Sequence, residues 1–385
     1  MRILFPTLAR FPGPGASVIQ VANMAQAFAE LGHDVRLVAP AGPEDGDGRL
    51  PDPADLTKRF GFAPGFEVVT LSRRIHRGQS VLHAARIASM ATRGTDLVFS
   101  RNLRACLAPA LRGVPTVFEA HTVTSMVRPQ DRAVLSRLQR ARGFRGVVAI
   151  SRALADDLVA QLDVDPDRIL VAHDAVRPEV GAGAEVLPEV APASGGPTSV
   201  AYTGGLFPGK GAELIPAIAI RCPTLTFHVA GGPPEAADRL REDAERVGAT
   251  NVVVHGRIDP AAARRLQRSC DILIAPFARR VLSVSGDDIA RWTSPLKVFE
   301  YLASGRPMVV SDLPVLREVL RPEVDALMVP PEDLDGLAAA VLRLADDPSL
   351  RERLAASALE RVRSELTWDL RARRILERFV PERVR

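Results

Sequence analysis

The chain has 385 residues, of which 46% are hydrophobic and 25% are charged, and its net charge is +4 at pH 7. This composition is typical of a soluble globular protein, and the length exceeds the usual size of a single core, so we expect two domains. No apolar run approaches the roughly 20 residues that span a bilayer, and Pro6 interrupts the first segment too early for a signal peptide. We therefore expect a cytoplasmic protein.

In the first half of the chain, short apolar runs alternate with helical patterns. This alternation predicts an α/β fold with a doubly wound parallel sheet. A helix is predicted over 17–31, with Ser17 as its cap and Gly32 as its stop. The predicted strands are 3–6, 35–39, 97–100, 116–119 and 147–150.

The loop after the first predicted strand carries Gly13 and Gly15 and opens into that helix. Backbone amides there could receive phosphate or sugar oxygens, and the glycines would allow a close approach. The spacing is not Gly-x-Gly-x-x-Gly, and no acidic residue is placed to bind a ribose as a dinucleotide enzyme requires. A dehydrogenase is therefore a poor interpretation.

Residues 71–152 contain fifteen arginines against three acidic residues, a net charge of +12. The densest part, 128–142, predicts a helix with Leu135 and Leu138 on its apolar side. Two interpretations stay open: contact with an anionic membrane surface, or an ordinary amphipathic helix with its arginines in water. Nucleic acid is a weaker candidate, because no aromatic residues are interleaved. The basic residues singled out are Arg128, Arg132, Arg137 and Arg140.

The chain becomes rich in Pro, Gly and Ala near residue 177, and the alternation of elements then restarts. We predict an N-terminal acceptor-binding domain over 1–178, a linker over 179–197 and a donor-binding domain over 198–366. The last segment, 367–385, follows a long helix at 349–364 and could pack back on the first domain. The strands predicted in the second half are 199–203, 226–230, 251–255, 272–276 and 308–311.

Only three of the fifty basic residues are lysines, and two of them, Lys210 and Lys297, lie in loops marked by glycine or proline. An ammonium group on a flexible stem can follow a phosphate through a reaction. Lys210 lies in Thr203-Gly-Gly-Leu-Phe-Pro-Gly-Lys-Gly211, where a helix dipole would point at the same anion. The alternative is that both lysines are solvated surface cations.

Lys297 and Glu300 are three residues apart on a helix that begins near Pro295 and ends at Gly305. The cation could hold a diphosphate while the carboxylate accepts ribose hydroxyls. The alternative is a local ion pair within the helix.

These residues resemble the donor-binding loops of the retaining glycosyltransferases of family 4, which have the GT-B fold of two Rossmann-like domains facing across a cleft. The resemblance rests on residues 202–211 and on Ser294-Pro-Leu-Lys-Val-Phe-Glu-Tyr-Leu-Ala-Ser-Gly305. It extends to Phe118-Glu-Ala-His121, to the turn Gly231-Gly232 and to Thr367-Trp-Asp.

By this resemblance, Lys210 and Lys297 contact the donor diphosphate and Glu300 holds the ribose. His121 resembles the active-site histidine near the sugar and the acceptor, although a histidine at a strand end can also be purely structural. The remaining donor-binding candidates are Gly13, Gly15, Gly204, Gly205, Gly231, Gly232, Ser294, Pro295 and Leu296.

The sequence departs from the family pattern at two positions. Trp292 stands where the first Glu of a Glu-x7-Glu pattern would be, which removes a carboxylate that meets the donor sugar. Gly205 replaces a phosphate-binding arginine that Lys297 or Arg291 could offset.

No metal site is expected. The three cysteines, Cys106, Cys222 and Cys270, lack ligand spacing and predict reduced thiols. The acidic pairs suit helix and turn positions. These pairs are Asp156-Asp157, Asp163-Val-Asp165 and Asp287-Asp288.

The resemblance implies a metal-independent hexosyltransferase or related enzyme without a cofactor. It would move a sugar from a nucleotide diphosphate sugar, with UDP-sugar preferred over GDP-sugar, to a hydroxyl acceptor with retention. The arginine excess favours a lipid-linked or anionic glycan acceptor in polysaccharide or glycoconjugate biosynthesis, with possible peripheral contact at the inner face of the membrane. Two alternatives stay open: a sugar-nucleotide isomerase or epimerase on the same fold, and a non-catalytic nucleotide-sugar-binding partner of a synthase complex.

Overall fold

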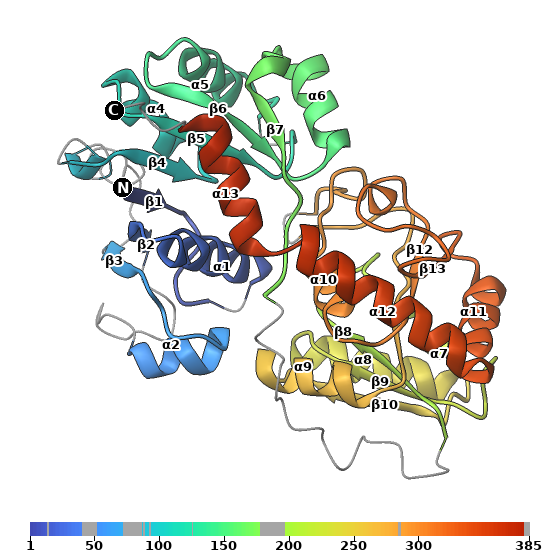
Figure 1. Cartoon of the computed structure of the whole chain (residues 1–385). Helices are drawn as coiled ribbons and strands as arrows, with labels where there is room; N and C mark the ends of the chain where they lie inside the picture. Colours follow the sequence, from blue (N-terminus) through green and yellow to red (C-terminus); the bar gives the residue numbers. More distant parts are fainter. Residues whose placement is uncertain are drawn as a thin grey trace. The chain divides into compact units, whose positions relative to one another are not determined.

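The computed structural model describes residues 1–13, 15–40, 52–71, 87, 89–91, 94–124, 126–177, 197–283 and 286–380. The chain divides into two compact units, each with its own parallel sheet (Figure 1). Unit 1 comprises Met1–Asp174 and the chain from Trp368 onward, and unit 2 comprises Ala175–Thr367. The predicted linker, 179–197, lies outside the described residues except for Pro197.

The sheet of unit 1 has seven parallel strands in the order β3-β2-β1-β4-β5-β6-β7. Ile3 of the central strand pairs with Val35 on one side and with Leu97 on the other. Its strands are β1 (Arg2–Pro6), β2 (Asp34–Pro40), β3 (Glu67–Leu71), β4 (Leu97–Ser100), β5 (Thr116–Ala120), β6 (Phe144–Ala149) and β7 (Ile169–Val171). Its helices are α1 (Ala16–Glu30), α2 (Pro53–Phe60), α4 (Leu103–Leu111), α5 (Pro129–Gln139), α6 (Arg152–Leu162) and α13 (Trp368–Phe379).

The sheet of unit 2 has six parallel strands in the order β10-β9-β8-β11-β12-β13. Its strands are β8 (Ser199–Thr203), β9 (Thr226–Ala230), β10 (Val252–Gly256), β11 (Ile272–Ala275), β12 (Met308–Ser311) and β13 (Leu327–Val329). Its helices are α7 (Ile215–Ala219), α8 (Pro234–Arg246), α9 (Pro260–Ser269), α10 (Leu296–Leu302), α11 (Leu334–Asp346) and α12 (Pro348–Glu365).

Both sheets have the Rossmann order, in which the chain reverses its direction of travel beside the first strand of the unit. The reversal falls between β1 and β4 in unit 1 and between β8 and β11 in unit 2. Loops at the carboxyl ends of these strands splay apart and leave room for a ligand. The predicted candidate loops at residues 7–15 and 204–211 therefore follow strands at these two reversal points.

The C-terminal helix α13 packs on α1 and β6, far from its neighbours in the sequence (Figure 1). Unit 1 ends at Asp174 rather than at residue 178, because Val176 pairs with Thr367 and is buried in the core of unit 2. The chain therefore passes between the units at two adjacent points, and α13 completes unit 1.

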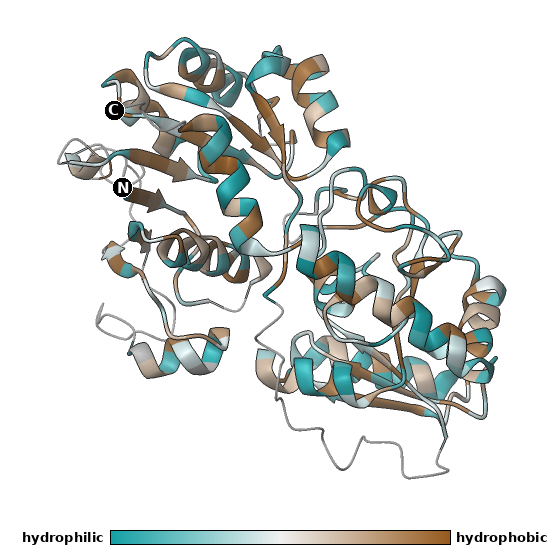
Figure 2. Ribbon diagram, in the orientation of Figure 1, coloured by the Kyte–Doolittle hydropathy of each residue, from teal (hydrophilic) through white to brown (hydrophobic). Residues whose placement is uncertain are grey.

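The inner strands β4, β5, β11 and β12 are buried along their whole length and are mainly apolar, as parallel strands covered on both faces require (Figure 2). The predicted inner strands are confirmed. The strands β3, β7 and β13 were not predicted; all three lie at the edges of their sheets, and β7 and β13 have only three residues each. The three cysteines are buried and free. In the described part of the chain, no helix is both long enough and apolar enough to cross a membrane.

The prediction that Ser17 caps the first helix is wrong. Helix α1 begins at Ala16, and Gly15 is its cap without a side-chain hydrogen bond. Gly32 follows the end of the helix with φ of +83°, as predicted for a helix stop.

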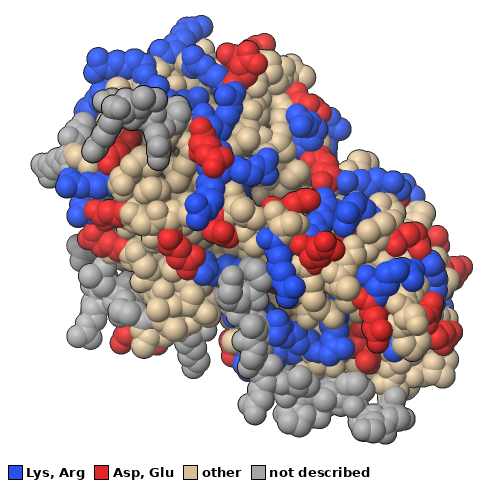
Figure 3. Space-filling model, viewed as in Figure 1, with Lys and Arg blue, Asp and Glu red and all other residues tan. Residues whose placement is uncertain are grey.

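The predicted basic helix corresponds to α5, which buries Leu135 and Leu138. Basic side chains gather over the part of unit 1 that contains α4 and α5 (Figure 3). Arg132 forms an ion pair with Asp163 at 3.0 Å, whereas the described residues give Arg137 and Arg140 no ion-pair partner. The charge of α5 is thus only partly neutralised within unit 1.

Candidate functional site

In unit 2, the loop between β8 and α7 is held in place by the only two tyrosines of the chain. The Tyr202 hydroxyl lies 2.8 Å from the Gly205 carbonyl oxygen and 3.1 Å from that of Lys210, so it spans the loop from within. The Tyr301 hydroxyl, on α10, accepts a hydrogen bond from the Thr203 amide at 2.7 Å. Both side chains are fully buried. The loop therefore has a set shape before any ligand binds.

Glu213 organises the second half of the same loop. Its carboxylate accepts hydrogen bonds from the amides of Gly209 and Gly211, at 2.5 and 3.1 Å. The loop leads into a three-residue 3-10 helix, Ala212–Leu214, and then into the five-residue α7. The sequence predicted that the dipole of this helix would help Lys210 to hold an anion, and this prediction is wrong. The amides of Gly209 and Gly211 already bind the Glu213 carboxylate, and the helix has only five residues.

The glycines of this region are required by close approaches of the backbone. Gly231 has φ of +132°, and a Cβ atom there would lie 1.8 Å from the Gly204 carbonyl oxygen. A Cβ atom on Gly204 would lie 2.9 Å from Lys297 Cε, and one on Gly232 would meet the Leu206 side chain at 2.6 Å. The β8 and β9 loops thus touch main chain to main chain, next to the Lys297 stem.

Lys297 is a buried lysine in the first turn of α10. It is 9% exposed, and its Nζ lies 3.7 Å from the ring centre of Tyr202 and 5.3 Å from that of Phe277. Nζ has no hydrogen-bond partner among the described residues. Both alternatives from the sequence, a solvated cation and a local ion pair with Glu300, therefore fail for Lys297.

The structure brings the two candidate lysines close enough to interact. Burial, and then the positive charge of Lys210, lower the pKa of Lys297 well below its usual range, while Glu213 and Glu300 act in the opposite direction. Burial also lowers the pKa of Lys210, which is half-buried. Two ammonium groups in one partly dehydrated place repel each other, and an anion placed between them would relieve that repulsion.

Glu300 lies one turn after Lys297 and is also withdrawn from water. Burial raises its pKa, which the nearby Arg264 guanidinium opposes. Gln267 Nε2 lies 3.4 Å from Glu300 Oε2 and 2.8 Å from Thr203 Oγ1. No sequence signal pointed to Arg264 or Gln267, because the pattern of residues 260–269 is that of an ordinary amphipathic helix.

The other candidates of unit 2 lead into α10 or line the loop. Pro295 is the N-cap residue of α10, preceded by Ser294, and Leu296 is its first residue.

A Cβ atom on Gly205 would lie 2.9 Å from the Phe207 ring, which is 40% exposed. Phe207 therefore occupies space beside the position where the family pattern has an arginine.

In unit 1, His121 directly follows β5 and belongs to a buried polar cluster. Its Nε2 lies 2.9 Å from Glu119 Oε1, and its side chain is 19% exposed. The same oxygen accepts hydrogen bonds from Gln20 on α1 at 2.6 Å and from Arg371 on α13 at 3.0 Å. Arg101 donates to Gln20 Oε1 at 3.0 Å. The histidine is thus the exposed end of a buried network.

The charges of this cluster shift its pKa values strongly. Burial would raise the pKa of Glu119, but the Arg371 charge and the His121 hydrogen bond outweigh it and lower that pKa to about 2. Burial, and then the Arg101 charge, lower the pKa of His121 to about 4. At neutral pH, Glu119 is therefore a carboxylate and His121 is uncharged. The sequence predicted His121 but missed Arg371, which lies 252 residues from Glu119 along the chain.

The two glycines of the first loop have different roles. A Cβ atom on Gly13 would lie 2.6 Å from the Arg10 carbonyl oxygen, so the packing of the loop itself excludes a side chain there. A Cβ atom on Gly15 would make only an ordinary contact, at 3.6 Å from Ser17 Oγ, and Gly15 is the N-cap residue of α1.

The acidic pairs have the structural positions predicted for them. Asp163 ends α6 with φ of +54°, and Asp165 caps a short 3-10 helix. Asp288 accepts hydrogen bonds from the amides of Val281 and Ala290. In the described residues, no three His, Cys, Asp or Glu side chains are grouped as a metal site would require; independence of metal ions stays a prediction.

Two Rossmann-type units in one chain define the class of proteins with the GT-B fold. Comparison with known proteins supports this class. Residues 17–180 match the model described as "Glycosyltransferase Family 4", and residues 198–347 match "Glycosyl transferases group 1". The chain belongs to the family 4 glycosyltransferases.

Curated relatives are similar over part of their length. A phosphatidyl-myo-inositol mannosyltransferase of Mycolicibacterium smegmatis is 31% identical over 159 residues, which is 40% of this chain and 38% of the relative. A D-inositol 3-phosphate glycosyltransferase of a Nocardioides strain is 26% identical over 69% of this chain and 62% of its own length. The chain thus spans less than two thirds of each of these relatives.

Among solved structures, Anabaena HepE in complex with UDP and glucose has a TM-score of 0.73 and 16% sequence identity, and the match covers 99% of this chain and 100% of that chain. This similarity establishes the fold.

Proposed function

We propose that the chain is a retaining glycosyltransferase that uses a nucleotide diphosphate sugar, with UDP-sugar as the first choice and GDP-sugar as the second. The observation that carries the proposal is the buried Lys297 Nζ, which has no hydrogen-bond partner in the described residues and lies near Lys210. An unsolvated ammonium group is costly unless an anion joins it. A diphosphate would supply that anion.

The chemistry that follows is electrostatic. Transfer breaks the bond between the anomeric carbon and the diphosphate, so negative charge grows on the leaving oxygen. Cations that are already oriented toward that charge stabilise the transition state without reorganisation. Lys210 and Lys297 would do so, while Glu300 would accept ribose hydroxyls. Retention, with the leaving phosphate taking the acceptor proton, follows from the resemblance to the family.

The acceptor is proposed to be a hydroxyl of a lipid-linked or anionic glycan. The support is the incompletely neutralised basic surface on unit 1 and a relative named as a phosphatidyl-myo-inositol mannosyltransferase. HepE, which shares the fold, was solved with UDP and glucose, and this supports UDP as the first nucleotide to try.

The proposal is tested by measuring nucleotide binding and turnover. A thermal-shift screen with UDP, GDP, ADP and TDP identifies the base, and incubation with the matching sugars and a panel of acceptors detects transfer. We expect Lys210→Ala and Lys297→Met each to lower turnover about 100-fold, as the loss of one transition-state donor does. Arg246→Met, an exposed residue of α8, is the control and should leave turnover unchanged.

The outcomes separate the alternatives. Conversion of the donor alone, without an acceptor, would indicate an isomerase or epimerase. Nucleotide-sugar binding without turnover across the panel would indicate a non-catalytic binding protein, for which Trp292 in place of a carboxylate is the motivating feature. Near-normal turnover in both lysine variants would contradict the proposed donor site.

A further inference from the structure

His121 has a defined hydrogen-bonding state in unit 1. Its Nε2 lies 2.9 Å from an oxygen of Glu119. An ionised carboxylate only accepts hydrogen bonds, so Nε2 must carry a hydrogen and donate it. The neutral imidazole has one N–H group, and Nδ1 is then left as an acceptor. No described residue forms a hydrogen bond with Nδ1.

Glu119 is held in turn by donors from three parts of the chain. Gln20 reaches it from α1, His121 from the end of β5 and Arg371 from α13. All three bonds go to Oε1, so the carboxylate has one fixed orientation. Glu119 is fully buried, and water does not compete for these bonds.

Arg371 cannot swing away from this position easily. Its side chain is 3% exposed. Its Nε donates to the His173 carbonyl oxygen at 2.8 Å, and the same amino group that bonds Glu119 also donates to the Ala172 carbonyl oxygen at 3.1 Å. The guanidinium thus donates hydrogen bonds both to the backbone that follows β7 and to Glu119.

We propose that Arg371 is a positioning residue that acts through Glu119 to keep His121 as the Nε2–H tautomer, so that Nδ1 is presented as a hydrogen-bond acceptor for a sugar hydroxyl. The identity of the ligand rests on the proposed function, but the tautomer does not. Helix α13 would thereby determine which nitrogen of His121, at the end of β5, donates a hydrogen bond and which accepts one.

The charged and titratable groups around His121 determine the direction in which its pKa should shift in each variant. Arg101 and Arg371 disfavour the imidazolium and Glu119 favours it. Asp174, which interacts with Glu119 and Arg371, is the remaining buried carboxyl of the cluster. Loss of the Arg371 charge should therefore raise the pKa of His121, and loss of the Glu119 charge should lower it.

The test is nitrogen NMR of protein labelled with 15N-histidine, without ligand, across the pH range from 4 to 8 (about one unit per step). His121→Asn identifies the signals among the seven histidines. We expect the wild-type ring to be the neutral Nε2–H form above about pH 5. Arg371→Gln should raise its pKa, and Glu119→Gln should lower it and mix the tautomers. Arg373→Gln, exposed on the same helix, should change neither.

A purely structural ion pair between α13 and β5 would change stability in these variants but leave the His121 titration in place. An Nδ1–H tautomer in the wild type, or an unchanged pKa in Arg371→Gln, would overturn the proposal. If Arg371→Gln does not fold, the paired variant Glu119→Gln with Arg371→Gln removes both members of this ion pair together, and a retained pure Nε2–H form there would also overturn the proposal.

Activity gives a separate readout. The pH at which turnover falls on acidification should rise in Arg371→Gln, and Arg371→Lys should restore it in part. Absence of any transfer by the wild type, together with the expected tautomer, would reject the proposed function and leave the positioning role intact.

Discussion

At the scale of single residues, Asp174 and Glu119 show how the environment shifts the pKa values of two buried carboxyls of unit 1 in opposite directions. Burial raises the pKa of Asp174 to about 7, although the Arg371 charge acts against it. Glu119 accepts hydrogen bonds from His121 and Arg371, and its pKa falls to about 2. Two acidic side chains of one cluster thus carry different charges below neutral pH.

Asp174→Asn should therefore change the pH dependence of stability. In the unfolded chain an aspartate titrates near its ordinary value of 3.8, so between about pH 4 and pH 7 the folded state holds a proton that the unfolded state has lost. The wild type loses stability as the pH rises through that window, by at most roughly 1.4 kcal/mol per pH unit.

Asp174→Asn has no proton to release at this position, so it does not lose stability in this way. The difference between its free energy of unfolding and that of the wild type should therefore become more positive from pH 4 to pH 7. Urea denaturation at several pH values measures the difference, with the exposed Asp156→Asn as control. Parallel stability curves for wild type and Asp174→Asn would contradict the expectation.

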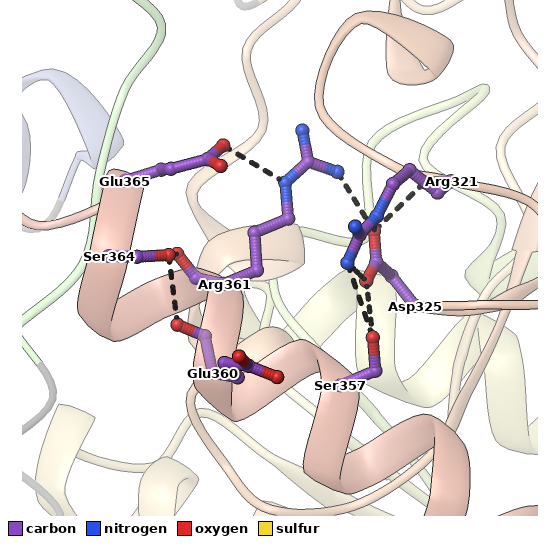
Figure 4. A network of polar contacts seen from close by, with 7 residues as sticks. All are labelled: Arg321, Asp325, Ser357, Glu360, Arg361, Ser364 and Glu365. Atoms are coloured by element: carbon purple, nitrogen blue, oxygen red, sulfur yellow. Dashed lines mark hydrogen bonds and ion pairs between the residues drawn. The ribbon is translucent and has the colours of Figure 1, made fainter.

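At the scale of elements, Asp325 anchors α12 to the loop between β12 and β13 (Figure 4). Its carboxylate accepts hydrogen bonds from Arg321 at 2.7 and 2.9 Å, from Arg361 at 2.8 Å and from Ser357 at 3.2 Å. Its side chain is fully buried. Burial would raise the pKa of Asp325, but the hydrogen bonds from Arg321 and Arg361 outweigh it and keep that pKa below its ordinary value.

Asp325→Asn should destabilise unit 2 by about 3 kcal/mol at neutral pH, because removal of a buried charge partner leaves the arginines uncompensated. A carboxyl with a lowered pKa stabilises the fold above its unfolded pKa and loses that effect as the pH falls. The gap between variant and wild type should therefore shrink below about pH 4. Thermal melts check this, and Asp238→Asn, in an exposed pair on α8, should cost well under 1 kcal/mol.

The contact between the β8 and β9 loops gives a second prediction at this scale. Gly231→Ala would place a methyl group 1.8 Å from the Gly204 carbonyl oxygen, at φ of +132°. The strain should lower stability by about 3 kcal/mol and weaken UDP binding, since Gly204 lies against Lys297.

Gly248→Ala is the matched control, because its φ is +74° and no atom lies within 4 Å of the added carbon. It should cost about 1 kcal/mol and leave UDP affinity unchanged. Calorimetric titration and thermal melts separate the two effects; equal losses in both variants would show that the backbone contact has no special role.

At the scale of the whole molecule, the charge is distributed unevenly along the chain, and residues 71–152 of unit 1 carry a net charge of +12. If this surface meets a membrane, each arginine near anionic lipid adds about 1 kcal/mol. The combined change of Arg128, Arg137 and Arg140 to Gln should then lower binding to phosphatidylglycerol vesicles about 100-fold at low salt.

Co-sedimentation measures the binding. High salt should abolish it in the wild type because it screens exposed charges, and phosphatidylcholine vesicles should not bind. Arg241→Gln with Arg246→Gln, on α8, is the control. No sedimentation with anionic vesicles at low salt would remove the membrane from the proposed partners.

Much of this architecture could be read from local patterns. Apolar runs, and the glycines and prolines between them, predict the inner strands and the helices α1, α5, α10 and α12, because such signals lie within a few neighbouring residues. The candidates Lys210, Lys297 and His121 were found in the same way, since each lies in a loop directly after a strand or at a helix start.

Local patterns did not reveal which distant groups meet. The edge strands β3, β7 and β13 each pair with one neighbouring strand, β2, β6 and β12, which lies elsewhere in the sequence. The amides of the lysine loop bind Glu213, and Arg371 reaches Glu119 across 252 positions. Burial and through-space charge set the protonation of Lys297, Glu119 and His121, and both depend on distances that exist only once the chain has folded.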